Sequence, residues 1–231
     1  MKKFILLSLL SVLFIMGCSV TESENVKTSG IWAHYIIEED EMGSLTAWAI
    51  LRVGGGTGTI IDLSGGEHME CNGDVMNEWV EPITNYHWSR IMPDEDPQRL
   101  YDFTFVRTDE EVTTQVELPY PPIITDIQVA LMANGDGFTV TWDASNAEDF
   151  VSIQFSGECI DTAVDYDVPD DGEYVFTDLV VNPAFIGTEC ELDVWVTREI
   201  EGDVNPLFQG GYTEARAIAH DTVTYTLPVL E

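Results

Sequence analysis

Apolar side chains recur at every second position through most of this chain, and this alternation limits its fold more than any other feature. The stretch IWAHYIIEED places Ile31, Ala33, Tyr35 and Ile37 on one face, and SLTAWAILRV continues the pattern. A period of two is that of a strand with one buried face, whereas an amphipathic helix repeats every 3.6 residues. Helix-like spacing is almost absent from Gly30 onward. The sequence therefore predicts an all-β protein.

Turn sequences divide the alternating segments into short strands. Asn72-Gly73-Asp74 readily supplies positive φ, and residues 108–111 separate two strands as in a hairpin. Three prolines within LPYPPII, residues 118–124, form a stiff extended connector. We therefore predict two tandem immunoglobulin-like β-sandwich domains, residues 30–118 and 119–231, after a polar tether at 18–29.

The second strand series resembles a fibronectin type III domain. GFTVTWDASNAEDFVSIQF, residues 137–155, is similar to the second and third strands of that family, with Trp142 at its Trp position. Leu179 stands where the family carries a packing leucine. The resemblance covers about residues 119–200 and implies an immunoglobulin-like sandwich. Cys190 stands where the family usually has a tyrosine, which puts the family's hydrogen-bonded tyrosine corner in doubt here.

The N-terminus has the order of an export signal. Two lysines precede an apolar run over residues 4–16, and that run is shorter than the ~20 residues that a membrane span needs. The stretch FIMGCSV, residues 14–20, ends the run at Cys18 and resembles the signal of bacterial lipoproteins, although Met16 is larger than usual. The resemblance implies removal of residues 1–17 and a diacylglycerol on the Cys18 thiol. An ordinary cleaved signal with an incidental cysteine is the alternative.

Three cysteines remain once Cys18 is assigned to lipid. Cys159 continues the parity of the apolar positions in residues 151–155, and Cys190 shares the parity of Leu192. Both thiols then point inward from strand ends, and an exported protein lies in an oxidising compartment. We therefore predict a Cys159–Cys190 disulfide and expect Cys71 to be a buried, inert thiol.

The charge of the chain limits its partners. It has 42 acidic and 9 basic residues, a formal net charge of −33. Such a surface repels nucleic acid and attracts cations, polyamines or a basic partner. The other interpretation is a solvated acidic surface suited to salty surroundings. With 45% hydrophobic and 10% aromatic residues, the chain is not expected to be disordered.

No motif identifies a reaction. The four histidines lie in separate segments, at His34, His68, His87 and His220. His68 and Cys71 are three residues apart, which on a strand places them on opposite faces, so no metal site is expected. Gly54-Gly55-Gly56 lacks the lysine and helix of a phosphate loop and predicts a turn. The chain contains no Gly-x-Ser-x-Gly elbow.

Acidic loops and tryptophans are the remaining candidates for a ligand site. DYDVPDDGEY does not have the spacing of a calcium loop, and residues 169–172 favour a turn. Similar acidic loop tips occur at residues 94–96 and at Asp143 with residues 148–149. Trp142 is expected in the core, whereas Trp48 and Trp195 have outward parity. They could bind a ligand or pack between the domains.

We therefore expect a membrane-anchored envelope lipoprotein that acts as a non-catalytic structural or protein-interaction module, with no cofactor. The lipid bilayer, through acylated Cys18, and an envelope protein are the expected partners. Ser19 in place of an aspartate implies the outer membrane, with the domains periplasmic or surface-exposed. The alternative is a carbohydrate- or calcium-binding adhesin-like surface lipoprotein. An enzyme would need a concave pocket with a perturbed carboxylate or histidine.

Overall fold

The chain is built almost entirely from strands. The computed structural model describes residues 21–80, 85–91, 99–132, 135–145, 149–176, 184 and 188–226. Two 3₁₀ turns, η1 (Ser23–Asn25) and η2 (Thr28–Gly30), accompany the strands. The strands are β1 (Thr21–Glu22), β2 (Ile31–Glu39), β3 (Leu45–Val53), β4 (Thr59–Asp62), β5 (His68–Cys71), β6 (Asp74–Val75), β7 (Asn77–Val80), β8 (Asn85–Ile91), β9 (Leu100–Val106), β10 (Glu111–Glu117), β11 (Ile124–Met132), β12 (Gly135–Trp142), β13 (Phe150–Gly157), β14 (Ile160–Pro169), β15 (Glu173–Phe176), β16 (Glu189–Gly202) and β17 (Gly210–Thr226). The all-β class predicted from the alternation is confirmed.

The first sandwich packs two sheets around an aromatic core. One sheet runs β4-β3-β2-β17, with β8 on β3 and β7 on β8, and the other runs β10-β9-β5-β6. The side chains of β2 that were predicted to share a face are all fully buried, and Tyr35 stacks on Phe103 with ring centroids 4.9 Å apart. Burial of one strand face therefore follows the sequence pattern.

The second sandwich has the two-sheet architecture of an immunoglobulin-like domain. Strands β11-β12-β15 form one sheet, and β17-β16-β13-β14 form the facing one. Three phenylalanines meet between the sheets, because the ring centroid of Phe155 lies 5.6 Å from that of Phe138 and 4.7 Å from that of Phe176. Trp142 is buried in this core, as predicted. Leu179 lies outside the described residues.

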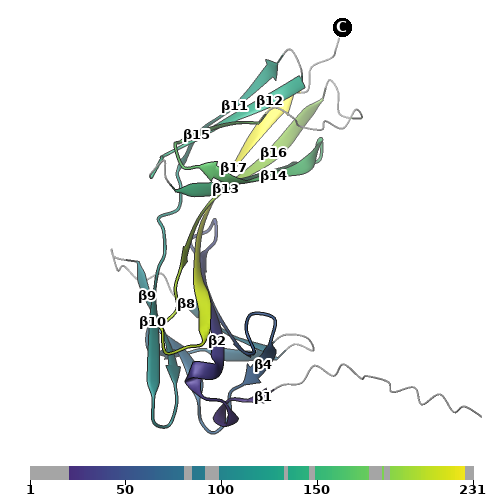
Figure 1. The fold of residues 1–231 in the computed structure, drawn as a ribbon. Coiled ribbons are helices and arrows are strands. Elements are labelled where there is room, and N and C mark those ends of the chain that lie inside the picture. The colour runs from purple at the N-terminus through teal and green to yellow at the C-terminus, as the bar shows by residue number, and fades with distance from the viewer. Residues whose placement is uncertain are drawn as a thin grey trace, which may run out of the picture.

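The last strand belongs to both sandwiches. Residues 210–217 of β17 pair in parallel with β2, and residues 213–226 pair antiparallel with β16. The result is one ten-stranded sheet that runs from one lobe to the other (Figure 1). Phe208, Ala215 and Ala217 are buried in the first core. The division at residue 118 remains a prediction, and it did not include this return of the chain into the first sandwich.

The segment expected to be a free tether is folded from Thr21 onward. β1 pairs in parallel with β4. The side chains of Ser23 and Thr28 are buried, and Val26 packs against the first core. The tether expectation for 18–29 therefore needs correction over 21–29. A polar, aperiodic segment can still order when its polar groups find partners in the folded domain.

Predicted turns lie where the sequence placed them. Asn72 and Gly73 have φ of 51° and 83° between β5 and β6, and Gly54 has φ of 90° after β3. The hairpin around residues 108–111 joins β9 to β10. The described residues include no helix with the length and apolar character that crossing a bilayer requires.

Candidate functional site

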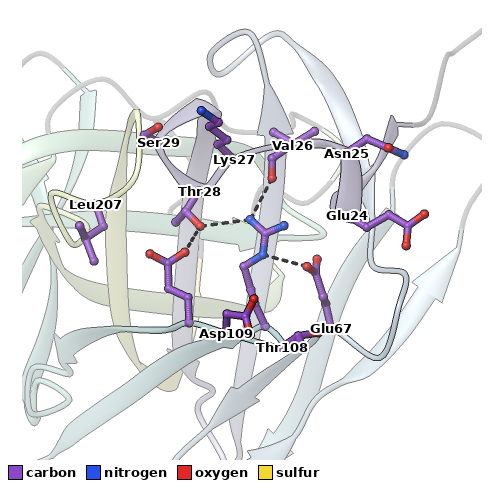
Figure 2. Close-up of a pocket in the computed structure, with 12 residues that line it drawn as sticks. Glu24, Asn25, Val26, Lys27, Thr28, Ser29, Glu67, Thr108, Asp109 and Leu207 are labelled. Carbon is purple, nitrogen blue, oxygen red and sulfur yellow. Dashed lines mark hydrogen bonds and ion pairs between the residues drawn. The ribbon is translucent and has the colours of Figure 1, made fainter.

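A cavity of about 720 Å³ lies beside the N-terminal segment (Figure 2). Half of its wall comes from the segment that follows β1, and the rest comes from the turn between β9 and β10 and from two single residues. The lining residues are Glu24, Asn25, Val26, Lys27, Thr28, Ser29, Glu67, Arg107, Thr108, Asp109, Glu110 and Leu207. The cavity therefore exists only because the N-terminal segment is docked on the sandwich.

Arg107 holds this segment in place. Its Nε donates to Glu67 Oε1 at 2.8 Å, and its Nη1 donates to the Val26 carbonyl at 2.9 Å and to Thr28 Oγ1 at 3.1 Å (Figure 2). Its Nη2 donates to the Ser23 carbonyl at 3.0 Å. The planar guanidinium, with five donors, suits such a cluster of oxygens. Arg107 thus donates to the Val26 carbonyl and adds a second donor to the Ser23 carbonyl, which already accepts from the Val26 N–H.

The chemistry of the cavity is that of polar binding. Four carboxylates line it, against the cations of Arg107 and Lys27, and neither histidine nor cysteine is among the lining residues. The Thr28 hydroxyl donates a hydrogen bond to the Glu110 carboxylate. The same hydroxyl accepts a hydrogen bond from Arg107 Nη1, so it belongs to the network that fastens the segment. The cavity has the polar groups to hold a polar ligand. Its charged side chains also fasten the N-terminal segment, which leads back toward residue 18.

A buried ion pair organises the second sandwich. Asp170 is fully buried and accepts hydrogen bonds from Trp142 Nε1 at 2.6 Å, Ser145 Oγ at 2.7 Å and Arg198 Nε at 2.7 Å. Burial alone would raise the pKa of Asp170, but these hydrogen bonds and the Arg198 charge hold it below its ordinary value. Arg198 also donates to the Tyr120 carbonyl at 3.2 Å. The pair therefore joins β16 to the proline-rich connector.

The predicted turn at residues 169–172 lies between β14 and β15. Its Asp170 carboxylate is paired with an arginine, a partner that the turn sequence did not predict. The sequence contains a pattern from which this ion pair could have been predicted. Arg198 continues the inward parity of Cys190, Leu192 and Val194, and an inward arginine requires a carboxylate partner.

The predicted disulfide is present. Cys159 and Cys190 are bonded, with their Cα atoms 6.0 Å apart. Cys71 is a buried free thiol, and burial, with Asp102 and Asp74 nearby, raises its pKa to about 12. A thiol that stays protonated is a poor nucleophile, as expected for an inert position. Cys18 lies outside the described residues, so its lipidation remains a prediction.

The described histidines bind carboxylates of the protein. His34 Nε2 lies 3.2 Å from Glu214 Oε2, and His68 Nε2 lies 3.0 Å from Glu70 Oε1. His220 Nε2 lies 2.9 Å from Asp193 Oδ1. Among the residues that the structure describes, no three His, Cys, Asp or Glu side chains are grouped to hold a metal ion. The side chain of His87 is outside the described set.

The half-buried tryptophans among the described side chains lie on β2, β3 and β16. Trp195 is half-buried and stacks on His220, with centroids 4.9 Å apart. Trp32 meets Tyr212 edge-on at 5.7 Å. Trp48 is half-buried on β3. In the register of β3 and β8, Trp48 lies opposite Trp88, whose side chain is outside the described set. Residues 94–96 and 148 lie outside the described part of the chain.

Sandwich geometry therefore defines the class of this protein, an immunoglobulin-like β-sandwich protein with a shared strand. No protein-family model matches the sequence, and no curated protein matches it. Among solved structures, the crystal structure of domains A168–A170 from titin matches with 10% identity over 86% of this chain and 62% of that chain, at a TM-score of 0.26. A score that low carries no argument, so the class rests on the sheets described above.

Proposed function

We propose that this protein is a lipid-anchored, non-catalytic interaction module of a bacterial outer membrane. The observation that carries the proposal is the cysteine at position 18, which follows Gly17 at the end of an apolar export signal. Acyl chains contribute about 0.8 kcal/mol for each buried CH₂, so two or more chains anchor a protein stably. The immunoglobulin-like fold suits presentation of a surface, although such folds host many functions.

The docked N-terminal segment gives the proposal a spatial consequence. Only Ser19 and Val20 separate the acylated Cys18 from Thr21, which is paired with β4. Three extended residues span at most about 11 Å. An anchored chain would therefore hold the first sandwich next to the bilayer and place the second sandwich farther out. The β1–β4 pairing holds Thr21, and Arg107 holds the segment that follows it.

Intact mass spectrometry of the membrane-extracted protein tests the anchor. A Cys18→Ala variant is the control, because it keeps the export signal but removes the thiol that lipid would modify. We expect a mature chain that starts at Cys18 and carries acyl chains, with no acyl mass in the variant. A chain that begins at another residue and carries no lipid would overturn the proposal.

A further inference from the structure

The disulfide of the second sandwich lies beside a cavity of about 700 Å³. The cavity forms where the turn between β13 and β14 meets the first residues of β16, and Cys190 is part of its wall. Gly157 lets the two segments approach, because a Cβ there would lie 2.7 Å from the Glu191 carbonyl oxygen. The Cys159–Cys190 bond therefore joins the two segments that enclose the cavity.

The two sulfur atoms of this bond differ in access. Cys159 is fully buried, whereas Cys190 is 6% exposed and lines the cavity. The Cys190 Sγ lies 3.5 Å from the carbonyl oxygen of Glu191, which lines the same cavity. A thiolate breaks a disulfide by attacking one sulfur and expelling the other. Access therefore makes Cys190 the sulfur that an incoming thiolate meets.

The charge around Cys190 is negative. The charged side chains in the described part of the wall are those of Glu158, Glu189, Glu191 and Asp193. Among the described ion pairs, only Asp193 of these four has a partner, His220. Residues 108–197 contain 20 aspartates and glutamates but neither lysine nor arginine, so no base of this stretch offsets the carboxylates. An approaching reagent therefore meets a negative potential before it reaches the sulfur.

We propose that the Cys159–Cys190 bond is a thiol-exchange site whose cavity selects the attacking thiol by charge. The thiolate sulfur bonds to Cys190 Sγ, the bond to Cys159 breaks, and the Cys159 thiolate takes a proton from solvent. A second thiolate then attacks the reagent's sulfur in this mixed disulfide. That step releases Cys190 as a thiol and the reagent as its own disulfide. The wall attracts a thiol that carries an ammonium group and repels one that carries a carboxylate.

This selection goes beyond the anchored module proposed above and holds whether or not Cys18 carries lipid. Glutathione has a net negative charge, so it belongs to the repelled reagents. An oxidoreductase that opens the bond needs a basic surface around its reactive cysteine, because complementary charge speeds the encounter.

Reduction rates with three small thiols test the selection. Cysteamine carries an ammonium group, 2-mercaptoethanol has no second charge, and mercaptoacetate carries a carboxylate. Each reduces the full chain in a non-ionic detergent, and the new thiols are alkylated and counted by intact mass. Each rate is divided by the rate of the same thiol on bis(2-hydroxyethyl) disulfide, a neutral reference that cancels differences in intrinsic reactivity.

The ratio of the two extreme normalised rates, cysteamine over mercaptoacetate, is the measured selectivity. We expect it to be about tenfold in about 10 mM NaCl, where the Debye length is about 30 Å. In about 1 M NaCl, where the Debye length is about 3 Å, it should fall below about threefold. Equal normalised rates for the three thiols at low salt would overturn the proposal.

Matched variants separate the cavity from the general charge of an acidic protein. E158Q/E189Q/E191Q should reduce the selectivity at least about threefold, because it removes carboxylates from the wall. E41Q/E111Q/E117Q removes the same charge from exposed positions of the first sandwich and should change the selectivity less than about 1.5-fold. Equal changes in the two variants would contradict the proposal. So would rates that do not rise with thiol concentration, since the bond would then be reduced only after the domain unfolds.

Discussion

Arginine side chains in this protein fasten segments that are distant in sequence. Arg107 holds the N-terminal segment, and Arg198 holds the connector. The Arg99 guanidinium donates hydrogen bonds to the carbonyls of Leu118 at 3.2 Å and Pro119 at 2.7 Å. It also forms an ion pair with Glu39. One guanidinium can bond several oxygens in a fixed geometry, which an ammonium cannot. The chain has few basic residues, and each of these arginines joins several elements through hydrogen bonds of one side chain.

Removing the buried carboxylate at position 170 should be costly. Asp170→Ala leaves the Arg198 charge buried without its partner, so we expect the free energy of unfolding to fall by about 3–5 kcal/mol. Urea denaturation measures this loss. The exposed neighbour gives a matched control, and Asp171→Asn should change stability by less than about 0.5 kcal/mol. A loss below about 1 kcal/mol at position 170 would contradict the structural role.

The same carboxylate should also respond to acid. The pKa of Asp170 is lowered in the folded protein, so its contribution to stability is present above the unfolded pKa of about 3.9 and is lost as pH falls through the folded value. We expect the stability difference between wild type and Asp170→Asn to shrink below about pH 4. Urea midpoints from pH 2 to pH 7 measure it, and a constant difference would refute the assignment.

Titration of His34 should produce a second pH dependence of stability, in a different pH range. Burial, followed by the charges of Arg216 and Arg52, lowers its pKa to about 4. The unfolded histidine binds protons below about pH 6.5 and the folded one does not, so stability should decline from pH 6.5 toward pH 4. We expect a loss on the order of 3 kcal/mol. His34→Gln should remove this slope, and an unchanged slope in that variant would show that another group is responsible.

At the scale of elements, β17 decides how the two sandwiches are joined. Its first half needs β2 as a parallel neighbour, and Gly211 allows the two backbones to approach. A Cβ at Gly211, where φ is 138°, would overlap the Ala33 carbonyl. The preceding loop is held by Asn205, whose backbone N–H donates to Thr114 Oγ1 at 3.0 Å. Pairing and loop contacts together fix the β16–β17 hairpin in the first core.

Gly211→Ala should therefore disrupt the shared strand. The clash is with backbone atoms, which cannot move without breaking the β2–β17 ladder, so we expect a loss of at least about 2 kcal/mol. Thermal unfolding measures the loss, and limited proteolysis should reveal new cleavage within residues 203–212. Gly30→Ala is the control, because its Cβ would meet only Val26 Cγ1 at 3.6 Å. Equal stability of the two variants would argue against the tight pairing.

For the whole molecule, the dominant physical quantity is the net charge of −33. Repulsion among surface carboxylates destabilises a compact state and is screened by salt, whereas buried pairs such as Asp170–Arg198 are screened much less. We expect the melting temperature to rise by several degrees, about 5 °C, as NaCl increases from 10 mM to 500 mM. Calorimetry measures it, with sorbitol at matched osmolality as the control. A fall in melting temperature with salt would mean that attractive surface pairs outweigh the repulsion.

Much of the fold could be predicted because alternation is a local property. The inward faces of β2, β13 and β16, the turn at Asn72 and the inward parity of both disulfide cysteines all follow from a period of two. The sites were predicted less well. Cys18 stays a prediction, the turn at Asp170 was predicted without its arginine partner, and Arg107 and Arg216 were not singled out, since a charged residue shows its function through its partners.

The sequence by itself determined which residues form strands and which face of each strand is buried, because burial of alternate side chains depends on neighbours within the strand. Only the tertiary structure decided that β17 pairs with β2, that residues 21–29 dock on the first sandwich and that Arg198 meets Asp170. These contacts join residues 28 to 180 positions apart. They depend on which strand edge and which carbonyls the folded sheets leave unpaired, and no local pattern records that.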